Sequence, residues 1–191
     1  MVEEMKIGKT IYVTKREEWR TWLKKNYDKE KEIWLIYYRK HTGKARISYN
    51  DSVEEALCFG WIDSILKKID DKKYAQRFTP RRNNSVLSEA NKERIRRLMK
   101  NKLMTPVGLK AVSHVFNSNS KEKFVISKDI LKAIRSDKQA WTNFKKFPSG
   151  YKRVRIGYIE DVRNYDKKMF ESRLNNFIKK SAKNIKFGQV I

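Results

Sequence analysis

The apolar run Ile33–Tyr38 constrains the fold of this chain more than any other feature of the sequence. It lies between the charged residues Glu32 and Arg39, it is too short for a helix, and its residues favour β-structure. A strand that lacks a polar face is typical of the interior of a sheet. We therefore expect residues 32–39 to form a central strand.

Three further strands are predicted in residues 10–80. Residues 10–13 (Thr-Ile-Tyr-Val) indicate a short strand, and residues 62–69 pair with residues 74–79 as a hairpin around a polar turn. Pro80 then ends the last strand. The sequence thus predicts a small mixed sheet of about four strands.

Capping signals predict two helices beside this sheet. Three residue pairs have the capping-box spacing, in which a polar side chain and a carboxylate satisfy the first free amides of a helix. These pairs are Thr14 with Glu17, Asp51 with Glu54, and Ser52 with Glu55. We expect Gly60 to end the second of these helices.

Beyond Pro80 the pattern contains helices only. Thr105 and Pro106 supply an N-cap and a proline at the first helical position. The expected helices cover residues 91–104, 106–112, 127–135, 137–146, 149–163 and 166–183. The fold class is therefore α+β, with an all-helical C-terminal extension. We expect an α/β domain in residues 1–86 and a basic helical domain in residues 87–191, with a polar linker near residues 117–123.

The positive charge of the chain is concentrated in its second part. The net charge is +24, and residues 1–80 contribute 18 Lys and Arg against 13 Asp and Glu, whereas residues 81–191 contribute 28 against 9. A negatively charged partner is therefore plausible, whether nucleic acid, anionic lipid or an acidic protein. Aromatic residues alternate with cations at residues 144–147, 151–155 and 177–180, but their helical spacing favours a core position over base stacking.

The sequence carries no signal for a membrane, a disulfide or a cofactor. Its longest apolar run is far shorter than the roughly 20 residues of a membrane span, and its first residues do not resemble an export signal. Cys58, the only cysteine, excludes an intramolecular disulfide and fits the buried side of its helix better than a nucleophile. Common nucleotide and catalytic motifs are absent, and His41 and His114 do not suggest a metal site. We expect a cytoplasmic protein without a cofactor, and we expect binding, with catalysis as the alternative.

The stretch from Cys58 to Arg82 contains the candidate binding residues, at a junction between a helix and a hairpin. They are Trp61, Asp63, Arg77, Thr79, Arg81 and Arg82. In one interpretation the arginines hold a phosphate or carboxylate and Trp61 forms a stacking wall. In the other, Trp61 is a core residue, Asp63 and Arg77 form a structural ion pair, and the remaining arginines are solvated. A third hypothesis makes Asp63 the general base of an enzyme, which adjacent cations oppose.

Several blocks of the sequence together resemble the YdeI/OmpD-associated family, also described as bacteriocin-protection proteins. The blocks are Phe59-Gly-Trp-Ile-Asp63, Arg77-Phe-Thr-Pro-Arg-Arg82, the serines and asparagine of residues 85–91, Met104-Thr-Pro-Val-Gly-Leu109, Phe147-Pro-Ser-Gly-Tyr-Lys-Arg153, Ile159-Glu160 and Arg173. Leu87 stands where members of that family usually have tryptophan. The resemblance implies an α/β part related to YdhG-like proteins, followed by a helical extension, and it implies no particular reaction.

These observations lead to one functional expectation and two alternatives. We expect a protein that binds a small anionic ligand or acts as a protective interaction protein, whose protein partner the sequence does not identify. The first alternative is weak, non-specific nucleic-acid binding through the basic C-terminal half. The second is an enzyme that uses Trp61, Asp63 and Arg77.

Overall fold

The computed structural model describes residues 6–116 and 124–188, so the proposed linker at residues 117–123 lies outside the described residues. The chain divides into two compact units. Residues 1–85 and 97–118 form the first, here called the N-terminal unit, and residues 86–96 and 119–191 form the second, the C-terminal unit. The boundary between them falls inside helix α3 (Glu89–Lys100).

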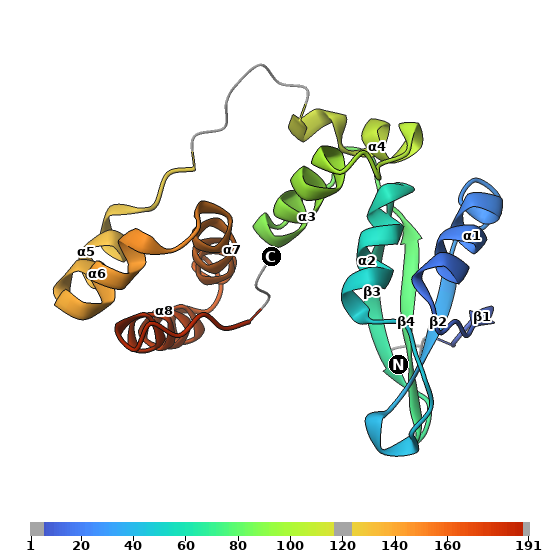
Figure 1. Ribbon diagram of the computed structural model, residues 1–191, viewed down its shortest axis with the longest axis horizontal. Helices are drawn as coiled ribbons and strands as arrows, with labels where there is room; N and C mark the ends of the chain where they lie inside the picture. The colour runs from blue at the N-terminus through green and yellow to red at the C-terminus, as the bar shows by residue number, and fades with distance from the viewer. Residues whose placement is uncertain (1–5, 117–123, 189–191) are drawn as a thin grey trace. The chain divides into compact units, whose positions relative to one another are not determined.

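The N-terminal unit contains a mixed four-stranded sheet in the order β1-β2-β4-β3 (Figure 1). Its strands are β1 (Thr10–Ile11), β2 (Ile33–Tyr38), β3 (Trp61–Lys68) and β4 (Lys73–Pro80). β1 is parallel to β2, and β4 is antiparallel to both of its neighbours. The prediction of a small mixed sheet, with β2 in its interior and Pro80 at the end of a strand, is confirmed.

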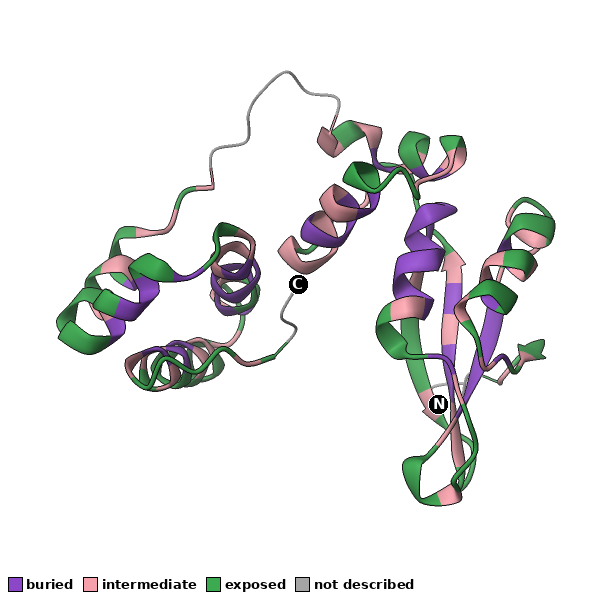
Figure 2. Ribbon diagram, viewed as in Figure 1, coloured by how far each residue is buried: buried purple, intermediate pink, exposed green. Residues whose placement is uncertain are grey.

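Two helices, α1 (Arg16–Asn26) and α2 (Tyr49–Cys58), cover one face of this sheet (Figure 1). The ring of Trp19 in α1 lies 5.4 Å from that of Phe78 in β4. The hydroxyl of Tyr37 in β2 is 2.5 Å from that of Ser52 in α2. Figure 2 shows the resulting band of buried residues along α2 and β2. Burial of these large side chains stabilises the unit by roughly 1.5–3 kcal/mol for each.

The opposite face of the sheet carries a smaller apolar cluster. Trp34, Ile36 and Ala75 are buried there, and Ile7 and Tyr38 pack against them. Alternate residues of β2 therefore meet apolar neighbours on both faces of the sheet. This explains why the sequence of β2 has no polar face.

The first helices begin with caps that differ from the predicted pairs. The backbone amide of Thr14 donates to the carboxylate of Glu18 at 2.8 Å, and not to that of Glu17. Helix α2 begins earlier than expected, because Ser48 is its N-cap and accepts the amide of Asp51 at 3.0 Å. The three predicted capping boxes are therefore wrong. Each helix start contains several polar residues at competing spacings, and the backbone path decides which of them caps.

Other breaks in the pattern are confirmed. Helix α2 ends two residues before Gly60, whose φ of 73° lies in the left-handed region that glycine tolerates. A 3₁₀ turn, η1 (Lys40–Thr42), follows β2. Helix α4 (Pro106–Phe116) begins as predicted, because the hydroxyl of Thr105 accepts the amide of Gly108 at 3.2 Å.

The C-terminal unit is helical in its described residues. Its helices are α5 (Lys128–Ser136), α6 (Lys138–Lys146), α7 (Ser149–Glu160) and α8 (Lys167–Ala182), together with the first part of α3. These bounds agree with the predicted helices to within a few residues. None of the helices in the described parts of the chain is long and apolar enough to cross a membrane.

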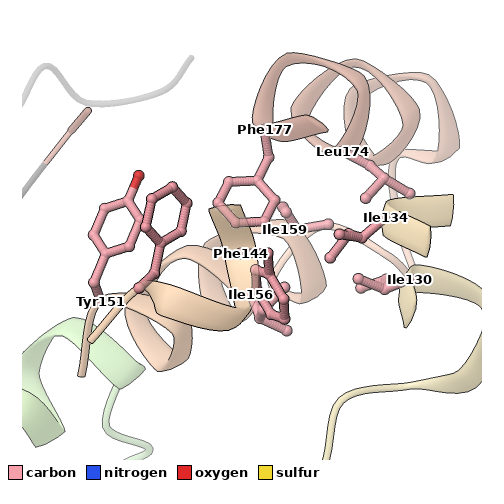
Figure 3. Close-up of a cluster of buried hydrophobic side chains, with 9 residues drawn as sticks. Ile130, Ile134, Phe144, Tyr151, Ile156, Ile159, Leu174 and Phe177 are labelled. Atoms are coloured by element: carbon pink, nitrogen blue, oxygen red, sulfur yellow. The ribbon is translucent and has the colours of Figure 1, made fainter. Parts of the chain in front are cut away.

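Buried side chains from all four of these helices form one apolar core, shown in Figure 3. Phe144 and Phe177 meet edge to face at 6.0 Å between ring centres, and Phe147 meets Tyr151 in the same way at 5.3 Å. These rings are the ones that alternate with cations in the sequence. The interpretation that they belong to a core is therefore confirmed.

Candidate functional site

Trp61, the first of the candidate residues, is part of the core of the N-terminal unit. Its side chain is buried, and its indole N–H donates to the carbonyl of Tyr27 at 3.1 Å. Its ring meets Trp22 edge to face at 6.0 Å. Because its only polar atom already has a partner, the interpretation of Trp61 as a core residue is confirmed.

Asp63 and Arg77 do not form the expected ion pair. Asp63 lies opposite Phe78 in the register of β3 and β4, so the side chain of Arg77, one residue away, points to the other face of the sheet. Asp63 instead accepts the hydroxyl of Tyr49 at 2.7 Å. Arg77 donates to the carboxylate of Glu32, with its Nε at 2.8 Å. The sequence alone does not define this register, which places the pair one position out of reach.

The other candidates lie near the end of β4. Thr79 is half-buried opposite Ile62. Arg81 donates through Nη2 to the hydroxyl of Ser85 at 2.9 Å. Burial lowers the pKa of the Arg81 guanidinium, and the negative charge of Asp63 opposes that shift. Arg82 is exposed. The structure thus brings Asp63 and Arg81 near each other but separates both from Arg77. A ligand site formed by Arg77, Arg81 and Arg82 stays a prediction.

A buried carboxylate network in the N-terminal unit was not predicted from the sequence. Glu55 is 2% exposed and accepts Nη1 of Arg20 at 2.6 Å and Nε of Arg16 at 2.5 Å. Glu54 accepts Arg16 at 3.1 Å and also pairs with Arg97. Every carboxylate of this network has a cationic partner, so the network offers no vacant negative charge to a ligand.

Cys58 is buried beside this network. Burial raises the pKa of its thiol to about 11, and the nearby carboxylate of Glu55 adds to the shift. A thiol with such a pKa is not a nucleophile near neutral pH. Among the described residues, no group of three or more His, Cys, Asp or Glu side chains could hold a metal ion.

The C-terminal unit contains a cavity of about 840 Å³, here called the α7–α8 cavity. Helices α7 and α8 form its walls, and the first turn of α3 and the segment that follows α8 complete it. Its lining residues are Ser88, Glu89, Ala90, Val154, Arg155, Tyr158, Asp161, Met169, Ser172, Arg173, Asn176, Phe187 and Gly188. This volume is typical of a pocket for a small organic molecule.

Arg155 is the unusual residue of this cavity. It is only 6% exposed, and its Nε is buried and has no hydrogen-bond partner in the described parts of the chain. The guanidinium carbon lies 4.1 Å from the ring centre of Phe187 and 4.9 Å from that of Tyr158. A Cβ atom at position 188 would lie 2.5 Å from Nη1, so the chain passes close to Arg155 at Gly188, whose positive φ also favours glycine.

A second guanidinium lies beside the same ring. The guanidinium carbon of Arg173 in α8 lies 3.7 Å from the ring centre of Tyr158. The Nη1 of Arg173 also donates to the backbone carbonyl of Tyr158 at 2.5 Å. Met169, Ser172 and Asn176 line the cavity from the same face of α8, because residues three and four apart are neighbours on a helix. The ring of Tyr158 thus holds two cations at the wall of one cavity.

The two carboxylates of the cavity are not ion-paired with these arginines. Glu89 pairs with Lys92 at 2.9 Å. Burial raises the pKa of Asp161, and the positive charge of Arg173 opposes that shift. Within residues 6–116 and 124–188, neither Arg155 nor Arg173 has a carboxylate within ion-pair distance. The cavity therefore combines two guanidinium groups, one of them deeply buried, with a mixed polar and apolar lining.

The sequence carries one signal for this cavity that was not used in the prediction. Tyr151, Arg155 and Ile159 are spaced by four residues and all three are buried. A cation on an otherwise apolar helical stripe is expensive to bury. Such a position therefore indicates a partner, which periodicity alone cannot identify.

The chain matches two protein families. Residues 123–184 match the family described as "Bacteriocin-protection, YdeI or OmpD-Associated". Residues 11–111 match the family described as "Domain of unknown function (DUF8412)". No curated protein and no solved structure matches the chain. The first of these families is the one that the sequence blocks resemble. Its match contains α5 to α8 and the blocks from Phe147 to Arg173, whereas the blocks from Phe59 to Leu109 lie in the region that matches the second family.

Proposed function

We propose that this chain, which belongs to the DUF8412 family and, in residues 123–184, to the bacteriocin-protection, YdeI or OmpD-associated family, binds a small anionic molecule in the α7–α8 cavity. One observation carries the proposal: Arg155 is buried at the cavity wall and its Nε has no hydrogen-bond partner in the described parts of the chain. The ligand supplies the missing acceptor.

The energetics support an anion in this position. Burying a guanidinium without a counter-charge costs several kcal/mol, even after relaxation. The rings of Tyr158 and Phe187 offset part of this cost, since a desolvated cation–π contact contributes about 2 kcal/mol. A carboxylate or phosphate in contact with the guanidinium forms charge-assisted hydrogen bonds, which are about twice as strong as neutral ones.

The surface charge of the chain favours the same kind of ligand. Residues 86–96 and 119–191, which form the unit that contains the cavity, hold 22 basic and 9 acidic residues, and this surplus attracts anions. A protective role, as the family's description suggests, would then act through a bound metabolite. We therefore place the binding site of that metabolite in the proposed α7–α8 cavity and not among the residues from Trp61 to Arg82.

Direct binding measurements test the proposal. Isothermal titration of the full chain with a panel of small carboxylates and phosphates should give saturable binding of at least one anion. The variant Arg155→Gln should lose that binding, because glutamine removes the charge but keeps a polar side chain. Lys179→Gln makes the same charge change at an exposed position of α8 and should bind like the parent chain. Equal binding by the parent chain and Arg155→Gln would contradict the proposal.

A second candidate function is non-specific nucleic-acid binding, and one feature of the N-terminal unit favours it. The backbone amide of Arg39 donates to the carbonyl of Lys72 at 2.8 Å, which joins the basic loop after β2 to the β3–β4 turn. Lys44 lies 4.4 Å above the ring of Tyr38, and Tyr12 beside it is 42% exposed. Cations and accessible rings together are typical of single-strand binding surfaces.

Gel shifts with a single-stranded oligonucleotide test this second function. Binding should weaken steeply between about 50 and 200 mM salt. The triple variant Lys40→Gln, Lys44→Gln and Lys72→Gln should weaken binding more than the triple variant Lys138→Gln, Lys145→Gln and Lys146→Gln. The two variants remove equal charge from exposed positions in different units. A larger effect of the second variant would favour the basic C-terminal half, and no gel shift at low salt would exclude both versions.

A further inference from the structure

The two arginines of the α7–α8 cavity are close enough to hold one ligand. Their guanidinium carbons lie 4.9 Å (Arg155) and 3.7 Å (Arg173) from the centre of the same ring, that of Tyr158. The distance between the two carbons cannot exceed the sum of these values. A single phosphate group or a short dicarboxylate spans such a distance.

Neither guanidinium of this pair is ion-paired with a carboxylate among the described residues. Burial lowers the pKa of Arg155, and the positive charge of Arg173 lowers it further. Both arginines nevertheless stay charged at neutral pH, because the guanidinium is not deprotonated in proteins. The carboxylate of Glu89 is already paired with Lys92. Asp161, the other carboxylate of the cavity, is near enough to Arg173 for that positive charge to act on its pKa, but it is not ion-paired with either arginine in the described residues. Two guanidinium groups thus face one cavity, and an anion with two negative charges can contact both.

We infer that the α7–α8 cavity is selective for an organic dianion, a phosphomonoester or a dicarboxylate, held between Arg155 and Arg173. The inference rests on the proposed function and names the class of its ligand. The size of the cavity, about 840 Å³, exceeds the need of an inorganic ion and leaves room for an organic body. Val154, Met169 and Phe187 offer that body apolar contacts, and Ser172 and Asn176 offer hydrogen bonds.

The geometry assigns different roles to the two arginines. Arg155 is held by its burial and by the rings of Tyr158 and Phe187, so it forms the fixed end of the site. Arg173 is only half-buried and is tied to the carbonyl of Tyr158 through one nitrogen. Its other nitrogens are the ones that a second negative charge can engage. Removing Arg173 should therefore abolish the preference for dianions and leave weaker anion binding at Arg155.

Matched ligands test this selectivity. Phenyl phosphate is a dianion at pH 7.5, whereas benzenesulfonate has a similar shape and one charge. Succinate and its monomethyl ester form a second pair, and the stronger pair shows whether phosphate or carboxylate is preferred. In titration calorimetry the dianion should bind roughly tenfold more tightly than its matched monoanion, as expected for one additional charge-assisted contact.

The pH dependence provides an independent readout. The second ionisation of a phosphomonoester has a pKa of about 6, so phenyl phosphate becomes a monoanion below that pH. Its advantage over benzenesulfonate should therefore disappear between pH 7.5 and pH 5, while binding of the sulfonate changes little. An advantage that persists unchanged at pH 5 would overturn the inference.

Variants separate this inference from the proposed function. Arg173→Gln should bind both phenyl compounds with similar affinity, and Arg173→Lys should recover part of the difference between them. Lys167→Gln, which removes an exposed charge from the same helix, should bind like the parent chain. Circular dichroism verifies that each variant is folded. If the parent chain binds monoanions and dianions equally, the inference fails and anion binding stands. If it binds neither of them nor any other anion, the proposed function fails as well.

Discussion

The β3–β4 hairpin of the N-terminal unit and the α7–α8 pair of the C-terminal unit both contain partly or fully buried arginines, but the partners of these arginines differ. In the hairpin, Arg77 meets Glu32 and Arg81 meets Ser85. In the helical pair, Arg155 has aromatic rings around it, and no nitrogen of its guanidinium donates to an acceptor among the described residues. The hairpin arginines thus have oxygen acceptors within the chain, whereas the guanidinium of Arg155 mainly contacts rings, and this difference is the reason for proposing the ligand site at Arg155.

The largest effect is expected where a carboxylate satisfies two arginines. Glu55→Ala leaves Arg16 and Arg20 without their shared partner and should lower the free energy of unfolding of the N-terminal unit by about 3 kcal/mol. Urea unfolding followed by tryptophan fluorescence measures this, because four of the five tryptophans lie before residue 86. Glu17→Ala, at an exposed position of α1, is the control. A loss no greater than that of the control would show that the network contributes nothing.

The hairpin and the helical pair should respond in opposite directions to the same substitution. Arg77→Met breaks a partly exposed ion pair and should destabilise the N-terminal unit by about 1 kcal/mol. Arg155→Met, without an added anion, removes a buried charge whose Nε lacks an acceptor within residues 6–116 and 124–188, and it should stabilise the C-terminal unit by about 1 kcal/mol. Native-state hydrogen exchange reports on the two units separately. If both substitutions destabilise their units equally, the contrast between the two arginines is wrong.

The smallest predicted effect concerns Arg153, which lies near Arg155 in α7 but, unlike Arg155, is ion-paired with a carboxylate among the described residues. Arg153 donates through Nε to Glu93 at 2.6 Å. Burial alone would raise the pKa of Glu93, but the hydrogen bond and charge of Arg153 lower it overall. The resulting stabilisation is complete above the unfolded-state pKa and is lost as the pH falls through the lower folded-state pKa. Thermal unfolding between pH 6 and pH 3 should therefore depend less on pH in Glu93→Gln than in the parent chain, and Glu171→Gln, an exposed control in α8, should show no such change.

Much of the fold could be predicted because its signals are local. The unbroken apolar run of β2, the proline after Thr105 and the glycine after Phe59 each define a strand or a helix end through their own conformational limits. The capping residues were misassigned because adjacent polar side chains offer equivalent spacings. Only the backbone path distinguishes Glu18 from Glu17.

The candidate site was harder to predict because it depends on contacts between distant residues. The pairing of Arg77 with Glu32 follows from the register of β2 against β4, which no local pattern defines. The deep burial of Arg155 depends on Phe187, which lies beyond the end of α8. The sequence shows a cation on an apolar stripe, but only the structure shows that no acidic side chain among the described residues is ion-paired with it.

The strand order of the sheet has a consequence for how the N-terminal unit folds. Strands β3 and β4 are adjacent in the chain and pair antiparallel, so their hairpin can form within about 1–10 μs. Strand β2 pairs with β4 across a long intervening segment, with Ile33 opposite Phe78, and closing that loop costs chain entropy first. We therefore expect docking of β2 onto the hairpin to limit the folding rate. Because Glu32 reaches Arg77 only after this step, Arg77→Met should accelerate unfolding more than it slows folding.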